Sequence, residues 1–160
     1  MDYKMLKTVL TKALLYRMMA NLDRLIYESE LSDQKLTERM GGKSHTWLNN
    51  AKNNAEDIRI SSLIRVLAEI QDEFKSSSGK DPLDKRQVSS LFDSTMLEIA
   101  KIINECKDGT SLNVEGLFSD RLNTYKDLKG DWGILKVKKK LSPEELSLIE
   151  ELTIIVQDKE

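Results

Sequence analysis

Apolar residues return every three or four positions along most of this chain, which is the spacing of an amphipathic helix. The pattern is strongest over residues 3–29, where leucines and a methionine recur at steps of four from Leu6 to Met18. This spacing predicts a long first helix with one apolar side. A break is expected near Asn21 or Asp23.

Residues 31–70 predict three short helices separated by two polar breaks. The expected helices and their N-caps are 33–40 with Ser32, 44–53 with Ser44, and 61–70 with Ser61. Gly41 and Gly42 end the first of them, since glycine tolerates the left-handed conformation that often follows a helix. The last is expected to bury five apolar side chains: Leu63, Ile64, Val66, Leu67 and Ile70.

A serine-rich stretch with Gly79 and Pro82 then interrupts the pattern. It predicts three parts: an N-terminal domain at 1–75, a linker at 76–86, and a mostly helical C-terminal module at 87–160.

The C-terminal module is expected to begin with a helix over about 85–105. Its apolar stripe comprises Val88, Leu91, Phe92, Met96, Ile99 and Ile103. After one or two short helices, residues 130–133 read as a turn, and 134–141 could be extended because apolar residues alternate with lysines. Ser142, Pro143 and Glu145 predict the start of a final helix, with a cap, a proline in its first turn and a capping-box glutamate.

The composition fits an all-α fold, because two prolines and seven glycines in 160 residues leave most of the chain free to be helical. Apolar residues make up 39%, which is enough for a core, and the formal charge is −2. That charge argues against a protein that coats nucleic acid indiscriminately. Between residues 35 and 65, however, six bases face three acids, and this local net of +3 has the sign needed for phosphate contacts.

Several classes of protein are disfavoured. Cys106 is the single cysteine and His45 the single histidine, so a disulfide, a zinc site or a Ser-His triad has too few parts. The segment 41–44, Gly-Gly-Lys-Ser, lacks the earlier glycine of a P-loop because Thr37 stands there. No apolar run approaches the roughly 18 residues of a membrane span, and no signal peptide is evident. We expect a cytoplasmic protein that is not an enzyme and uses no cofactor or metal.

The predicted helix over 44–53 has two chemically different sides. At about 100° per residue, Leu48 and Ala51 share one side, with Trp47 at its flank. The other side carries the candidate base-reading residues Thr46, Asn49, Asn50 and Asn53. Asparagine can bond adenine through two atoms in the major groove, and threonine can contact thymine. Candidate contacts to the DNA backbone are Gln34, Lys43, Ser44, His45 and Lys52. The alternative interpretation is a polar, solvent-facing side of a core helix.

Residues 20–72 resemble the helix-turn-helix of the lambda-repressor-like family, also called the Cro/CI or XRE type. The matching positions are Leu31-Ser32, Leu36-Thr37 and Met40-Gly41, then Trp47, Leu48 and Ala51, then Ile60, Leu63 and Val66. Three positions depart from the family pattern. Asp33 stands where a DNA-contacting glutamine is usual, with Gln34 beside it, while Lys52 replaces a glutamate and Asn54 a glycine. The resemblance implies a helix-turn-helix fold and binding to double-stranded DNA.

Together these features predict a transcriptional regulator of bacterial, phage or mobile-element origin, most simply a repressor that binds operator DNA as a homodimer. The apolar helices at 3–19 and 88–103 could each pack internally or supply the dimer interface. A second hypothesis assigns residues 87–160 to a protein partner. In that case Trp132 and the lysine run 136–140 would help an antitoxin, or an inhibitor of a nuclease defence system, to bind its target, while the N-terminal domain represses its own gene. The lysine run has a simpler interpretation as a solvated surface.

Overall fold

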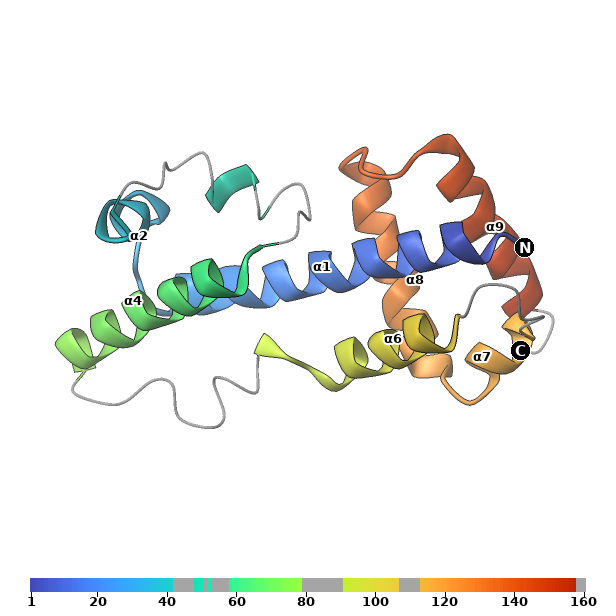
Figure 1. The fold of residues 1–160 in the computed structure, drawn as a ribbon, viewed down its shortest axis with the longest axis horizontal. Coiled ribbons are helices and arrows are strands. Elements are labelled where there is room, and N and C mark those ends of the chain that lie inside the picture. The colour runs from blue at the N-terminus through green and yellow to red at the C-terminus, as the bar shows by residue number, and fades with distance from the viewer. Residues whose placement is uncertain (42–47, 51, 53–57, 79–90, 107–112, 158–160) are drawn as a thin grey trace. The chain divides into compact units, whose positions relative to one another are not determined.

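The computed structural model describes residues 1–41, 48–50, 52, 58–78, 91–106 and 113–157 of the chain (Figure 1). All regular secondary structure in these residues is helical, which confirms the all-α prediction. The longer helices are α1 (Tyr3–Glu28), α2 (Asp33–Arg39), α4 (Ile60–Ser78), α6 (Ser94–Glu105), α7 (Val114–Ser119), α8 (Leu122–Val137) and α9 (Pro143–Gln157). None of the helices in the described ranges has the length and apolarity that crossing a bilayer requires.

The chain folds into two compact units, and they do not follow the predicted boundary at 76–86. One unit comprises Leu15–Asp93, which we call the central unit. The other joins Met1–Leu14 to Ser94–Glu160, and we call it the terminal unit. Helix α1 therefore contributes its first turns to the terminal unit and the rest to the central unit. Because α4 continues to Ser78, the first residues of the predicted linker are helical.

The predicted break in α1 is wrong, since this helix is continuous from Tyr3 to Glu28. Asn21 has a structural role instead. Its amide donates hydrogen bonds to the carbonyl oxygen of Leu91 at 3.2 Å and to the carboxylate of Asp93 at 3.1 Å. Asn21 therefore anchors the segment that leaves the central unit.

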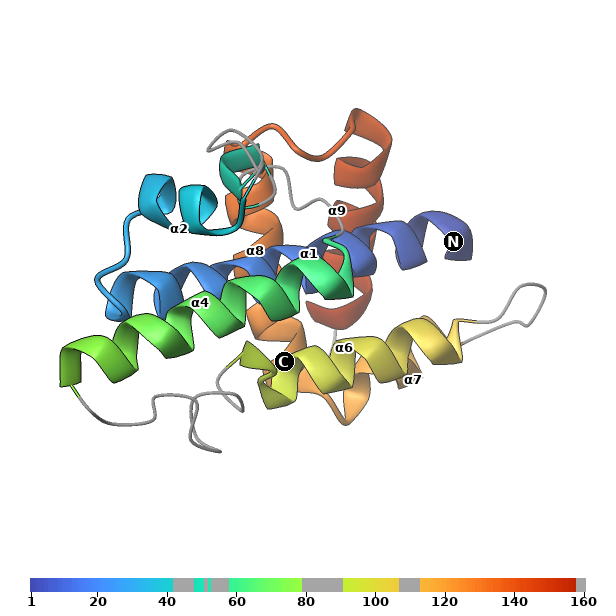
Figure 2. The same ribbon diagram turned by 60° about the vertical axis from the view of Figure 1, so that its left-hand side comes forward.

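In the central unit, α4 runs beside the C-terminal part of α1 and also packs against α2 (Figure 2). One apolar cluster holds these helices together: Met19, Leu22, Leu25, Ile26, Leu31, Leu36, Met40, Leu48, Ile58, Leu63, Val66, Ile70 and Leu91. Two predictions for α4 need correction. The helix begins at Ile60 rather than after a cap at Ser61, and Ile64 is 59% exposed rather than buried. Ile60, matched to a buried family position, is also exposed.

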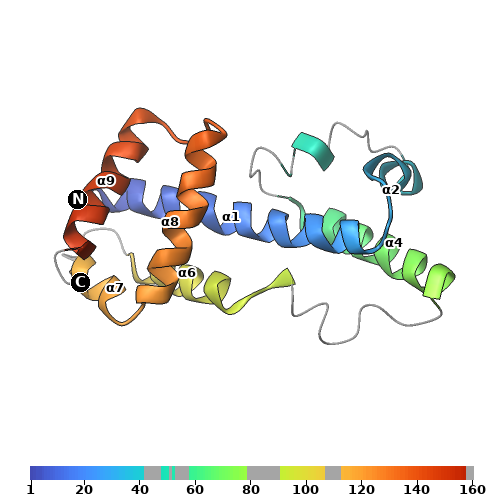
Figure 3. The ribbon, with the colours of Figure 1, turned by 180° about the vertical axis from the view of Figure 1, so that it is seen from behind.

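In the terminal unit, α6 and α7 pack on α8, and α7 also packs on α9. The indole nitrogen of Trp132 donates to the carbonyl oxygen of Val9 at 3.0 Å, which ties α8 to the first turns of α1 (Figure 3). The predicted capping box of α9 is confirmed. The amide of Glu145 donates to the Ser142 hydroxyl at 3.2 Å, and the amide of Ser142 donates to the Glu145 carboxylate at 2.9 Å.

Three predictions for the C-terminal half of the chain are wrong. The expected turn at 130–133 and extended segment at 134–141 are replaced by α8, which continues to Val137. Leu128, Trp132 and Leu135 are buried at helical spacing, so packing outweighs the low helix propensity of the nearby glycines. The helix predicted over 85–105 is interrupted after Leu91, and α6 starts at Ser94. Phe92, which was expected in the buried stripe, precedes α6 and is 48% exposed.

Candidate nucleic-acid interface

Helix α2 begins and ends as its sequence predicts. The Ser32 hydroxyl accepts a hydrogen bond from the amide of Lys35 at 3.1 Å, which is the interaction of an N-cap. After the helix, Gly41 has a φ of +56°, a left-handed conformation that a residue with a Cβ adopts only with strain. Leu36, Thr37 and Met40 are buried beneath α2. The chain is thus turned sharply just before the segment predicted to read DNA.

The described part of the predicted reading helix shows the expected two sides. Leu48, Asn49, Asn50 and Lys52 are helical. Leu48 is fully buried in the apolar cluster of the central unit, whereas Asn49 and Asn50 are exposed. The predicted reading residues Thr46 and Asn53, and the predicted buried residues Trp47 and Ala51, lie outside the described residues.

Lys52 is placed differently from the expected backbone contact. Its ammonium lies 2.6 Å from the carboxylate of Asp33 at the start of α2 and 2.7 Å from that of Asp23 on α1. Only 15% of the lysine side chain is exposed. Burial alone lowers the pKa of Lys52, but the hydrogen bonds and charges of the two aspartates outweigh it, so the pKa is raised above 10.5. Lys52 thus links the predicted reading helix to α1 and α2.

Other bases counted toward the local positive charge are also used within the central unit. Arg39 and Lys35 on α2 lie 2.7 and 3.7 Å from the carboxylate of Glu73 on α4. The hydrogen bond from Arg39 is the main reason that the pKa of Glu73 is lowered from 4.5. Arg65 donates to the carbonyl oxygen of Met40. Three of the six bases counted in this segment, Lys35, Arg39 and Arg65, therefore hold α2 and α4 together.

The remaining candidates for backbone contacts are only partly described. Gln34 is exposed on α2, where its amide donates to the carboxylate of Glu38 at 3.1 Å. Lys43, Ser44 and His45 lie outside the described residues. The sequence did not predict Asp23 as a partner of Lys52, because this ion pair depends on the packing of α1 beside the predicted reading helix. A hollow of about 450 Å³ lies beside this contact, lined in part by Asp23, Tyr27 and Lys52.

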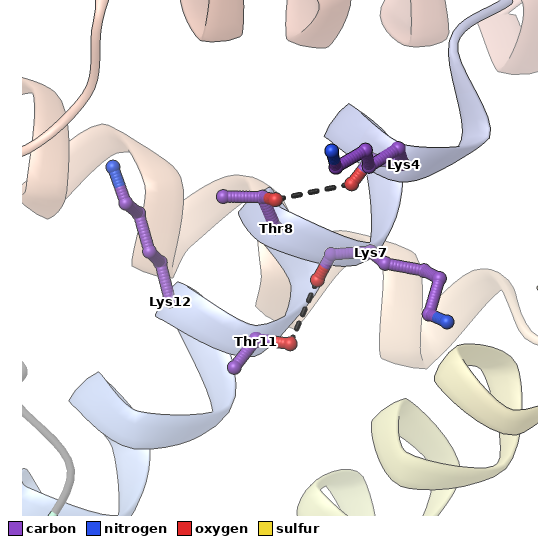
Figure 4. A pocket seen from close by; sticks show the side chains of 5 residues that line it. All are labelled: Lys4, Lys7, Thr8, Thr11 and Lys12. Atoms are coloured by element: carbon purple, nitrogen blue, oxygen red, sulfur yellow. Dashed lines mark hydrogen bonds between the residues drawn. The ribbon is translucent and has the colours of Figure 1, made fainter.

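A second hollow, in the terminal unit, is lined by Lys4, Lys7, Thr8, Thr11 and Lys12 (Figure 4). Its threonine hydroxyls donate to backbone carbonyl oxygens of α1, Thr8 to Lys4 at 3.0 Å and Thr11 to Lys7 at 2.7 Å. The ammonium of Lys12 is held by Glu145 at 2.7 Å. These donors already have partners in the fold, so this hollow is a weaker candidate for an anion site than its lysines imply.

Within the described ranges, no group of three or more His, Cys, Asp or Glu side chains is arranged to hold a metal ion. Comparison with known proteins assigns neither a family nor a function to this chain. No protein-family model, curated protein or solved structure matches this chain. The residues and geometry of the central unit therefore carry the functional interpretation.

Proposed function

We propose that this protein is a sequence-specific DNA-binding transcriptional regulator, a repressor that binds its operator as a homodimer. In this proposal α2 and the segment around Leu48–Lys52 form a helix-turn-helix. The observation that carries it is the placement of Asn49 and Asn50 on the exposed side of a helical segment whose Leu48 is fully buried. That arrangement presents asparagine amides while the core fixes the helix.

The chemistry of these side chains supports a reading role. An asparagine amide offers one donor and one acceptor group, which match the N6 and N7 atoms of adenine in the major groove. Asparagine is also a mediocre helix former. Two neighbouring asparagines on a short exposed helical segment therefore reduce local stability, and base recognition gives them a function.

The ion pairs of the central unit limit the affinity for DNA that we expect. Lys35, Arg39 and Lys52 each contact a carboxylate within the unit, so few of its described bases can neutralise phosphates without losing an intramolecular partner. Fewer phosphate contacts mean weaker binding and a shallower dependence on salt. A single copy is therefore expected to bind DNA weakly, and two copies on adjacent half-sites would supply the affinity.

Replacing both asparagines tests this proposal. Asn49→Ala/Asn50→Ala should weaken binding to a selected operator by at least about 30-fold, since each lost base contact contributes about 1 kcal/mol or more. Binding to random DNA should change little. Asn104→Ala is the matched control, because Asn104 is an exposed helical asparagine of the terminal unit. Equal operator affinity of both variants and the wild type, measured by fluorescence anisotropy, would overturn the proposal.

A further inference from the structure

The exposed surfaces of α8 and α9 in the terminal unit carry opposite charges. On α8, Lys126, Lys129 and Lys136 are exposed, and the exposed acid is Asp127, which accepts a hydrogen bond from the Thr95 hydroxyl at 2.7 Å. Helix α9, in contrast, contains no lysine or arginine. Its exposed side carries Glu144, Glu150 and Glu151. The two helices therefore present complementary surfaces within one chain.

Each of these surfaces also exposes apolar side chains. On α8, Val137 is 82% exposed and Ile134 is partly exposed. On α9, Ile154 is 65% exposed. Ile154 follows Glu150 and Glu151 by four and three residues, so all three are neighbours on the helix surface. An apolar contact flanked by opposite charges is the usual composition of a helix–helix interface, in which burial supplies affinity and charges select the partner.

Two glycines on the same side of α8 strengthen this interpretation. At 100° per residue, Gly130 and Gly133 lie on the exposed side with Lys126 and Val137. A Cβ added at either glycine would meet no atom within 4 Å in the described residues. Glycine is a poorer helix former than alanine, and nothing described in the terminal unit requires its small size at these positions. A second helix packed on this surface would approach the backbone closely at these positions.

We propose that the α8 surface of one copy, comprising Lys126, Lys129, Gly130, Gly133 and Val137, packs on the α9 surface of a second copy, comprising Glu150, Glu151 and Ile154. A second copy is the partner because the same unit carries the complementary surface. Two-fold symmetry makes the contact reciprocal, α8 on α9 and α9 on α8. This inference deepens the homodimer of the proposed function and rests on that part of it, whereas DNA reading by the central unit is a separate property.

A charge exchange between two variants tests the interface. Lys126→Glu/Lys129→Glu makes both surfaces of a chain acidic, and Glu150→Lys/Glu151→Lys makes both basic. Like charges should weaken self-association of each variant by at least about tenfold. An equimolar mixture should restore dimers, because each acidic surface then meets a basic one. All four substituted residues are exposed, so circular dichroism and thermal unfolding should show that both variants fold.

Native mass spectrometry and sedimentation velocity on the full chain supply the readout. The proposal predicts a dimeric wild type, two monomeric variants and heterodimers in the mixture. A wild type that stays monomeric, a variant that dimerises as tightly as the wild type, or a mixture that associates no more tightly than the separate variants would each overturn it. Asn49→Ala/Asn50→Ala should stay dimeric, so a failure of DNA reading is distinguished from a failure of this interface.

A second variant tests the close approach at the glycines without changing any charge. Gly130→Leu/Gly133→Leu should lower dimer affinity at least about tenfold, while the monomer becomes more stable than the wild type, because the space around both glycines is open and leucine is the better helix former. Asn104→Leu, an exposed substitution on α6 of the same unit, is the control. Unchanged dimerisation of the glycine variant would contradict the close packing of α8 on its partner.

Discussion

The ammonium of Lys52 lies 2.6 Å from the carboxylate of Asp33. In the proposed helix-turn-helix, Asp33 and Lys52 are two of the positions that differ from the expected family pattern. Their ion pair joins the start of α2 to the segment that carries Asn49 and Asn50. The ion pair gives both Asp33 and Lys52 a structural role, even though an aspartate at position 33 is unfavourable for contact with DNA.

Asp33 and Lys52 should be energetically coupled. Asp33→Asn is expected to lower the free energy of unfolding by about 1 kcal/mol, because it weakens a hydrogen-bonded ion pair that is mostly shielded from water. Asp23→Asn should cost less, since Asp23 is 58% exposed and Asp33 only 24%. Urea unfolding of Asp33→Asn, Lys52→Met and the double variant gives the coupling. Strictly additive effects would show that the contact contributes nothing.

The contact between α2 and α4 should weaken in acid. Arg39, hydrogen-bonded to Glu73, holds the pKa of that carboxyl below 4.5. A lowered folded-state pKa means that the stabilisation is fully present above pH 4.5 and is lost as the pH falls through the folded-state value. Glu73→Gln should therefore be less stable than the wild type at pH 7, and the difference should shrink below pH 4.5. If the urea midpoints of Glu73→Gln and the wild type fall by the same amount as the pH is lowered, Glu73 does not have this role.

Glu145 should stabilise the terminal unit more than its neighbour Glu144 does. It is buried, accepts a bond from Lys12 at 2.7 Å, and completes the capping box with Ser142. Glu145→Gln should lower the free energy of unfolding by about 2 kcal/mol, since it weakens a charged hydrogen bond and a helix cap together. Glu144→Gln is the matched comparison, because the neighbouring Glu144 is exposed and hydrogen-bonds Ser142 but not Lys12, so its loss should be smaller. If Glu145→Gln and Glu144→Gln lose the same stability in thermal unfolding, this role of Glu145 is wrong.

Gly130→Ala should stabilise the protein. Gly130 lies inside α8, its added methyl group meets no atom within 4 Å, and its φ is not in the left-handed region. The expected gain is about 1 kcal/mol in the free energy of unfolding, measured at concentrations where the chain is monomeric. Gly41→Ala is the contrasting variant and should destabilise, since Gly41 has a φ of +56°. A loss of stability in Gly130→Ala would show that the glycine has an intramolecular role.

Local signals in the sequence predicted three helix ends correctly. The Ser32 cap, the left-handed Gly41 and the capping box at Ser142 depend on residues within one turn of each other, so their chemistry is visible in the sequence. The alternation of apolar residues and lysines after residue 133 gave the wrong structure. There the contacts of Trp132 with a distant helix decide the conformation, and no local pattern records them.

The candidate site was predicted only in part, for a similar reason. The opposite placement of Leu48 and Asn50 follows from helical periodicity, and the structure shows it. The position of Lys52 depends on Asp23, which lies 29 residues earlier. Charge counting treated Lys35, Arg39 and Lys52 as available for phosphate, although each has a carboxylate partner in the fold. The packing of the helices decides which charged side chains form ion pairs, and the order of the residues in the chain does not show it.

Selection of bound sites from random duplex DNA by the full-length chain tests DNA reading most directly. We predict enrichment of an inverted repeat whose half-sites are centred about one helical turn, or a multiple of it, apart. Each half-site should contain adenines whose enrichment disappears in Asn49→Ala/Asn50→Ala and persists in Asn104→Ala. A pool that stays random with the wild-type chain, or the same motif with the double variant, would contradict a reading role for these asparagines.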